Sequence, residues 1–263
     1  MREECKIMAI ADKVPATVYE LLQQSARCFG ECTALTYLKE VSPKISDEKL
    51  SYSELLKNVN RVVRLINGHL EHADGSPIVT SFLLPNIPQT NYILWGAETA
   101  GIANPLNPML SDNALIALMD TAKTDILFAL GPNPDSNIWE KAQAVVDRLS
   151  KKTILISVNF PDLDSECHKH FDTLLPEYSD SPLSMDELPQ GSDIAAYFHT
   201  GGTTGAPKLA MLTHTNQVCT AEGYRQAMGG EIGDVGINGL PLFHVAGSLV
   251  QGLGSIAAGM DVV

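Results

Sequence analysis

The chain alternates between segments whose apolar residues recur once per helical turn and short, continuous apolar runs. The first pattern predicts amphipathic helices, and the second predicts buried strands. Helices are expected over residues 16–29, 51–68, 112–121, 136–149 and 213–228, strands over residues 34–38, 78–84, 125–129, 153–158 and 194–199, and a helix followed by a strand within residues 84–108.

This alternation predicts an α/β fold with mostly parallel, doubly wound sheets and helices on both faces, because parallel neighbours need crossover connections. Between residues 159 and 192 the pattern is replaced by a stretch rich in Asp, Pro, Ser and Glu. We interpret this stretch as a linker and the best domain boundary. It separates a predicted first subdomain, residues 1–190, from residues 191–263, which would begin a second one.

The C-terminal part carries weaker signals. A short strand is expected at residues 236–240, a buried helix at 245–260 and the first residues of another strand at 259–263. The helical stretch is too short for a membrane span. If the last strand lies at an open edge of its sheet, it leaves apolar surface bare, which favours self-association.

The strongest chemical signal is a loop that follows the predicted strand at residues 194–199. From Thr200 to Lys208 it contains three glycines, three threonines and one lysine within nine residues. Glycines let successive backbone N–H groups approach one ligand, hydroxyls donate hydrogen bonds or bind Mg²⁺, and an ammonium offsets negative charge. Together these groups predict a phosphate-binding loop.

Two better-known phosphate loops do not fit this stretch. A Walker A loop needs Gly-Lys-Ser/Thr, but Lys208 follows Pro207 and precedes Leu209. The three glycines do not have the G-x-G-x-x-G spacing of a dinucleotide fingerprint. An ordinary Gly/Thr turn is the remaining alternative, and the length and composition of the loop make it the poorer interpretation.

Composition limits the function classes. The 263 residues are 44% hydrophobic and carry a formal net charge of −13. Such a charge opposes nonspecific binding to nucleic acid or anionic lipid, so a polyanionic ligand must be held by a local cluster of donors. The 5 cysteines are irregularly spaced and do not suggest a disulfide framework. The N-terminus does not read as a signal peptide, so a cytoplasmic location is expected.

The loop resembles the signature of the adenylate-forming, AMP-binding superfamily, which includes acyl-CoA synthetases, peptide-synthetase adenylation domains and luciferases. Its members usually carry Thr-Ser-Gly-Thr-Thr-Gly-x-Pro-Lys-Gly, followed by Ser/Thr-His. This chain departs from that pattern at Gly201, where Ser is usual, and at Leu209, where Gly is usual. The matching residues are Thr200, Gly202, Thr203, Thr204, Gly205, Pro207, Lys208, Thr213 and His214.

Other segments resemble the family less specifically. Residues 241–244, P-L-F-H, match a family segment Leu-Pro-x-Phe/Tyr-His at about the expected distance from the loop. Ser51–Leu55 and Ala100–Asn107 also match family segments, and for those we expect structural roles. Ser51 and Glu54 have the spacing of a capping box at a helix start, and Gly101 is expected to cap a helix. By itself, His244 is better interpreted as a histidine bonded to a core carbonyl. Together with the upstream loop, the resemblance favours a functional role for it.

The resemblance implies that a carboxylate attacks the α-phosphorus of ATP, giving an acyl-adenylate and pyrophosphate, and that coenzyme A then displaces AMP. It implies ATP, Mg²⁺ and coenzyme A as cofactors and a small carboxylic acid as substrate. Lys208 and His244 would be the catalytic residues, with His244 at the mouth of the acyl and pyrophosphate site, and Thr204 would also contribute to Mg²⁺ binding. The residues implied to bind the nucleotide are Thr200, Gly201, Gly202, Thr203, Thr204, Gly205 and Lys208.

Family members continue with an aromatic-Gly-x-Thr-Glu segment, a Thr-Gly-Asp segment and a small C-terminal domain bearing a catalytic lysine, and this sequence contains none of them. We therefore expect an incomplete N-terminal domain of an acyl-CoA synthetase-like fold that is inactive alone. A noncatalytic binding or interaction module derived from that fold is the alternative. An unrelated phosphoryl-transfer enzyme is the weakest hypothesis, and the acyl substrate is narrowed only to an apolar carboxylate.

Overall fold

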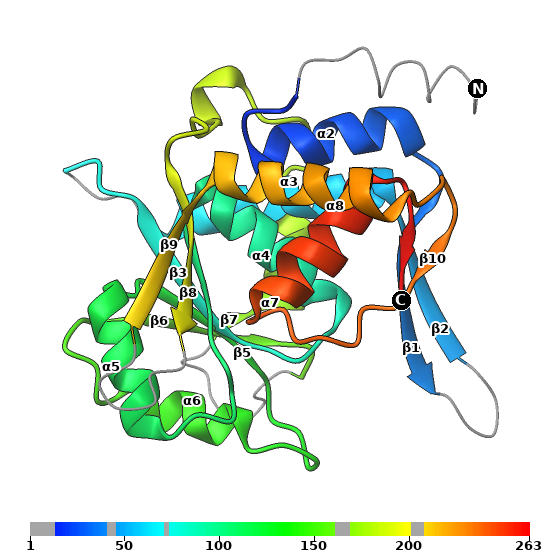
Figure 1. Cartoon of the computed structure of the whole chain (residues 1–263). Coiled ribbons are helices and arrows are strands. Elements are labelled where there is room, and N and C mark those ends of the chain that lie inside the picture. The colour runs from blue at the N-terminus through cyan, green and yellow to red at the C-terminus, as the bar shows by residue number, and fades with distance from the viewer. Residues whose placement is uncertain (1–13, 41–45, 71–73, 161–168, 201–207) are drawn as a thin grey trace. The chain divides into compact units, whose positions relative to one another are not determined.

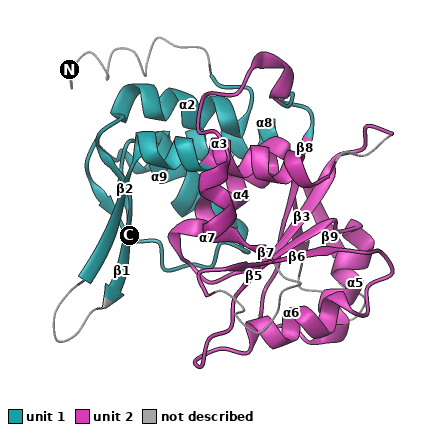
Figure 2. Cartoon of the chain, turned by 180° about the vertical axis from the view of Figure 1, so that it is seen from behind, with its two compact units in different colours: residues 1–58, 189–193, 213–263 teal, residues 59–188, 194–212 magenta. Residues whose placement is uncertain are grey.

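The computed structural model describes residues 14–40, 46–70, 74–160, 169–200 and 208–263. Within these residues the chain forms two compact units, which are coloured separately in Figure 2. Unit 1 takes its residues from the ranges 1–58, 189–193 and 213–263, and unit 2 from 59–188 and 194–212. The chain passes between the units close to the boundary predicted at 190/191. The assignment of residues 1–190 and 191–263 to family subdomains stays a prediction.

Unit 2 is built on a seven-stranded sheet with the order β7-β6-β5-β3-β4-β8-β9 (Figure 1). Its strands are β3 (Ile78–Leu83), β4 (Gly101–Pro105), β5 (Ile126–Leu130), β6 (Ile154–Val158), β7 (Lys169–His170), β8 (Ile194–Thr200) and β9 (Lys208–Thr213). Its helices are α3 (Tyr52–His69), which begins in unit 1, α4 (Pro88–Ala100), α5 (Asp112–Ala122), α6 (Ile138–Val146), α7 (Phe171–Leu174), and the short turns η1 (Leu175–Glu177) and η2 (Met185–Glu187).

The strands from β7 to β8 pair in parallel, as the alternating pattern predicted. All residues of β3 and β5 are buried, because helices cover both faces of the sheet. Side chains alternate along β5: Leu127 and Ala129 pack in a cluster with apolar residues of α5 and α6. Phe128 instead packs edge-on against Phe171 of α7, with 5.5 Å between ring centroids. The doubly wound α/β prediction is therefore confirmed for this sheet.

Gly101 marks the change from helix α4 to strand β4. Its N–H donates to the carbonyl oxygen of Ala97, so it caps α4 as the sequence predicted. An added Cβ at this position would lie 2.3 Å from the carbonyl oxygen of Ile78 on the neighbouring strand. The absence of a side chain therefore lets β4 begin beside β3 directly after the helix.

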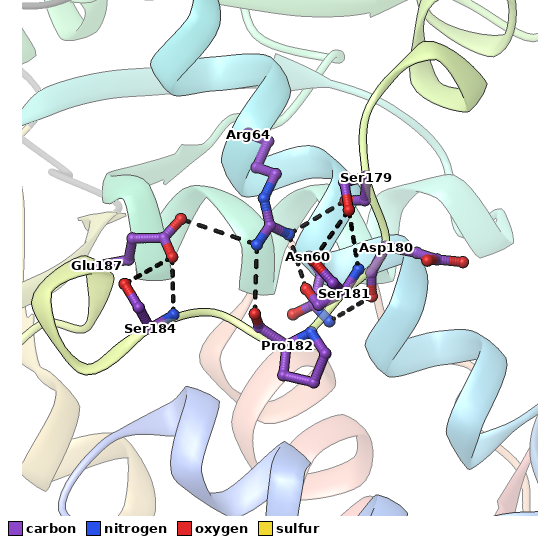
Figure 3. A network of polar contacts seen from close by, with 8 residues as sticks. All are labelled: Asn60, Arg64, Ser179, Asp180, Ser181, Pro182, Ser184 and Glu187. Atoms are coloured by element: carbon purple, nitrogen blue, oxygen red, sulfur yellow. Dashed lines mark hydrogen bonds and ion pairs between the residues drawn. The ribbon is translucent and has the colours of Figure 1, made fainter.

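The stretch between residues 159 and 192 was predicted to be a linker, and its described part is more ordered than that. It contains β7, α7, η1 and η2. Figure 3 shows that Arg64 of α3 contacts residues 179–182 of this stretch. The guanidinium donates to the carbonyl oxygens of Ser179 (3.1 Å), Ser181 (2.8 Å) and Pro182 (3.3 Å). These backbone contacts have no hydrophobic signature, which explains why the sequence pattern missed the ordered path.

Unit 1 contains a four-stranded sheet with the order β10-β11-β1-β2. Its strands are β1 (Thr33–Glu40), β2 (Ser46–Ser51), β10 (Val235–Gly236) and β11 (Asp261–Val262), and its helices are α2 (Val18–Phe29), α8 (His214–Met228), the π-helical η3 (Ala246–Leu253) and α9 (Gly254–Ala257). The buried helix predicted at 245–260 is therefore a π-helix followed by an α-helical turn. In the described part of the chain, no helix is both long and apolar enough to cross a membrane.

The position of β11 corrects one expectation. The strand predicted at the C-terminus exists, but it pairs in parallel with β1 on one side and β10 on the other. Val262 is buried. The expectation that β11 forms an open edge, which was the reason given for self-association, was therefore wrong. β11 lies inside the sheet because it pairs with strands that are distant in the sequence. Self-association itself stays a prediction.

Candidate functional site

The predicted phosphate-binding loop joins β8 to β9 in unit 2. Thr200 is the last residue of β8, and Lys208 is the first residue of β9. The Thr200 hydroxyl donates to the backbone carbonyl oxygen of Lys208 at 3.4 Å, which ties the two strand ends together. Both residues are exposed. The remaining predicted ligands, Gly201, Gly202, Thr203, Thr204 and Gly205, lie outside the described residues, so their role stays a prediction.

The two strand ends lie at the edge of the sheet where ligands bind in many α/β proteins. Strands β3, β4 and β8 are parallel, so their carboxyl ends share one edge. In open parallel sheets, ligands bind outside this edge. The predicted loop thus starts at the correct edge for a binding site.

Lys208 is available to a negatively charged ligand. Its side chain is exposed, and it forms no ion pair with another residue in the ranges that the structure describes. The formal charge of the whole chain is −13, so an exposed ammonium provides a local attraction for a polyanion that the chain as a whole would repel. Such a group attracts phosphate or carboxylate oxygens.

Residues that the sequence did not single out surround the start of the loop. His199, next to Thr200, accepts a hydrogen bond at Nε2 from the backbone N–H of Asn107, at 3.3 Å. Asn107 belongs to the turn after β4, and Lys141 of α6 donates to two carbonyl oxygens of that turn. The sequence did contain a signal for His199, because a polar ring stands at the end of an otherwise apolar strand. No local signal pointed to Lys141.

His244 lies in unit 1, two residues before the start of η3. Its ring nitrogen Nδ1 accepts the backbone N–H of Ala246 at 3.2 Å, and the side chain is exposed. The alternative of a histidine bonded to a core carbonyl is therefore not what the structure has. With Nδ1 as acceptor, the neutral ring carries its proton on Nε2, which can donate to a ligand. Its place at the acyl and pyrophosphate site stays a prediction.

The Thr213-His214 pair that follows the loop has a structural role in unit 1. Thr213 caps α8: its hydroxyl accepts the N–H of Asn216 at 3.2 Å, and its own N–H donates to the Asn216 side chain at 3.1 Å. His214 is fully buried, and its Nδ1 accepts the N–H of Val18 at 3.4 Å. These contacts fix the start of α8 directly after β9.

Comparison with known proteins agrees with these features. The family model of AMP-binding enzymes matches residues 22–263. The marinolic acid–CoA ligase of Pseudoalteromonas sp. is 30% identical over 261 residues, which cover 97% of this chain and 39% of that protein. A long-chain-fatty-acid–CoA ligase of Bacillus subtilis is 27% identical, over 94% of this chain and 46% of that protein.

Solved structures share the fold. The ATP-bound structure of MatB from Rhodopseudomonas palustris superposes with a TM-score of 0.70 and 19% identity, covering 94% of this chain and 45% of that one. The chain thus spans less than half the length of each of these three proteins. The loop that begins at the carboxyl edge of a parallel sheet and the family match over residues 22–263 lead to one conclusion: this chain belongs to the AMP-binding enzyme family.

Proposed function

We propose that this chain carries the nucleotide-phosphate-binding part of an ATP-dependent ligase that joins a carboxylic acid to coenzyme A. The observation that carries the proposal is the position of Lys208. Its side chain is exposed, and its backbone carbonyl oxygen accepts a hydrogen bond from Thr200 at the carboxyl edge of a parallel sheet. The family match and the two similar CoA ligases support the same assignment.

In the proposed reaction, an oxygen of the substrate carboxylate forms a bond to the α-phosphorus of ATP. The bond from that phosphorus to the bridging oxygen breaks, and pyrophosphate leaves with the negative charge. The thiolate of coenzyme A then attacks the acyl carbon, and AMP departs. Because charge accumulates on the pyrophosphate, donors arranged around it before the reaction lower the barrier.

Five of the predicted residues have a proposed part in this step. Thr203, Thr204 and Gly205 would donate to the β- and γ-phosphates, and Lys208 would offset the charge of the leaving pyrophosphate. Mg²⁺ would neutralise further phosphate charge, with the Thr204 hydroxyl as the ligand that we propose from this chain. His244 would donate from Nε2 at the acyl and pyrophosphate site.

For the substrate, we propose only a class of compound. The two similar ligases are named for marinolic acid and for long-chain fatty acids. We propose an apolar carboxylic acid for this chain too, and a part in fatty acid metabolism follows only if that acid is a fatty acid. A cytoplasmic location stays a prediction.

Binding of inorganic tripolyphosphate to the 263-residue chain tests the proposal, because this probe needs only the phosphate-binding residues. We expect isothermal titration to detect binding with Mg²⁺ present. Lys208→Met should weaken it by about tenfold or more, the value of one charge-assisted hydrogen bond. Lys152→Met is the matched control: Lys152 is also exposed but precedes β6 at the opposite edge of the sheet, so its loss should leave affinity within about twofold.

Two results would overturn the proposal. One is a wild-type chain that binds neither tripolyphosphate nor ATP. The other is a Lys208→Met variant whose affinity falls no further than that of Lys152→Met, because net charge alone would then account for the binding.

A further inference from the structure

Three elements of unit 2 meet at the carboxyl edge of its sheet. They are the turn after β4, residues 106–111; helix α6, which contributes Lys141; and the end of β8, which contributes His199. Neither Lys141 nor His199 belongs to the family signature loop. Their hydrogen bonds nevertheless form a continuous path toward Thr200.

The path begins at Lys141. Its ammonium donates to the carbonyl oxygens of Pro108 at 2.7 Å and Leu110 at 3.1 Å. Lys141 lies in the first turn of α6, where the helix dipole disfavours a positive charge. The two carbonyl dipoles offset that cost, and the ammonium in turn holds the turn after β4 in one shape.

Asn107 carries the path onward through the same turn. Its carbonyl oxygen accepts the N–H of Leu110 at 3.1 Å, and its side-chain oxygen accepts the N–H of Met109 at 2.9 Å. These bonds fix the direction of the Asn107 backbone. The Asn107 N–H then donates to Nε2 of His199 at 3.3 Å.

His199 connects this turn to the candidate site. It immediately precedes Thr200, whose hydroxyl donates to the backbone carbonyl oxygen of Lys208 at 3.4 Å. The positions of Thr200 and Lys208 therefore depend on where the His199 ring is held. A side chain without an acceptor near the place of Nε2 leaves the Asn107 N–H without this partner.

We propose that His199 and Lys141 are positioning residues for anion binding at Thr200 and Lys208. This inference rests on the proposed function. Neither residue needs to touch the ligand. They hold the ends of β8 and β9 in place before binding, so less conformational freedom is lost when a polyphosphate binds. Without them, the ammonium of Lys208 would sample more positions, and affinity would fall.

The test compares variants that keep or remove the acceptor on residue 199. Tripolyphosphate binding is titrated in the 263-residue chain with Mg²⁺, well below each variant's Tm. His199→Phe keeps a ring but removes the acceptor, and we expect affinity to fall by about five- to tenfold. His199→Gln places an amide oxygen near the position of Nε2, and we expect affinity within about twofold of wild type.

Lys141→Met tests the other end of the path. It keeps the aliphatic stem but removes the two bonds to carbonyl oxygens, so affinity should fall by about fivefold. Lys152→Met, which makes the same change in net charge at the opposite edge of the sheet, should leave affinity within about twofold of wild type. If His199→Phe does not fold, two comparisons still test the positioning role. They are His199→Gln against wild type and Lys141→Met against Lys152→Met.

The outcomes separate this inference from the proposed function. A wild-type chain that does not bind the probe overturns both. A second outcome would overturn only the positioning role. In that outcome, wild type binds the probe and Lys208→Met binds it weakly, but Lys141→Met and His199→Phe bind it like wild type. The proposed function would then stand. A fall in affinity for His199→Gln equal to that for His199→Phe would also contradict it, because the acceptor would then not matter.

Discussion

Single residues decide how closely helices α3 and α4 approach each other. Gly96 lies within α4, and a Cβ added there would be 2.5 Å from Cγ1 and 2.6 Å from Cβ of Val62 on α3. Both values are shorter than any ordinary carbon–carbon contact. Val62 is fully buried, so its side chain has little room to move. Gly96 is therefore required by packing, although glycine costs helix stability at this position.

We expect Gly96→Ala to lower the free energy of unfolding by about 1–3 kcal/mol, because overpacking exceeds the gain in helix propensity. Gly223→Ala is the matched control, since Gly223 lies in α8 and an added Cβ would meet no atom within 4 Å. This control should raise the free energy by up to about 1 kcal/mol. Urea unfolding of both variants measures the difference. Equal effects of the two substitutions would show that the close approach does not matter.

At the level of elements, side chains fix where helices begin. At the start of α3, the Ser51 N–H donates to the Glu54 carboxylate at 2.8 Å, and the Glu54 N–H donates to the Ser51 hydroxyl at 3.2 Å. The same reciprocal pattern starts η2 at Ser184 with Glu187. The backbone N–H of Ser51 lowers the pKa of Glu54, with the Ser51 hydroxyl as the second cause. The capping box at Ser51, which the sequence predicted, is thus confirmed.

This cap makes a pH-dependent contribution to stability. Because the pKa of Glu54 in the folded chain lies below its ordinary value of 4.5, the contribution is complete above that pH and is lost as pH falls through the folded value. We expect wild type to exceed Glu54→Gln in free energy of unfolding at neutral pH by less than about 1 kcal/mol, since the group is exposed to solvent. Urea titrations from neutral pH down to about pH 3 should show this difference shrinking. A difference that grows as pH falls would contradict the assignment.

At the scale of the whole molecule, length and charge bear on what we expect of the 263-residue chain by itself. It spans 39% and 46% of the two similar ligases, and its formal charge of −13 repels a nucleotide except where local donors compensate. The proposed site would provide donors for the phosphate end of ATP. The family segments that bind ribose and supply a catalytic lysine have no counterpart in this sequence.

We therefore expect the 263-residue chain to show no exchange of labelled pyrophosphate into ATP when an apolar carboxylic acid is added. The physical reason is that a triphosphate held at one end leaves the α-phosphorus poorly placed for in-line attack. A full-length family member assayed in parallel confirms that the conditions support exchange. Acid-dependent exchange by the 263-residue chain at an enzyme-like rate would contradict this prediction.

The elements that could be predicted are those with a strong apolar period. The helix expected at 112–121 is α5, and the strand expected at 153–158 is β6. Strand β2 (Ser46–Ser51) was missed because its residues, S-D-E-K-L-S, are mostly polar and exposed, so they form no apolar run. Strand β9 was missed because its residues lie in the short stretch between the glycine-rich loop and the helix expected from residue 213.

The sequence by itself determined the local features: the helices and strands that have a strong apolar period, and the cap at Ser51. It also predicted the phosphate-binding loop from its glycines, hydroxyls and lysine. These features depend on residues that are close together in the chain, so the sequence pattern is enough to predict them. Only the tertiary structure decided that β11 lies inside its sheet and that Lys141 and His199 both form hydrogen bonds with the turn after β4. The hydrogen bonds of Lys141 and His199 join residues 33 and 92 positions apart in the chain, and β11 pairs Val262 with Leu35. Such partners meet only when the fold brings them together.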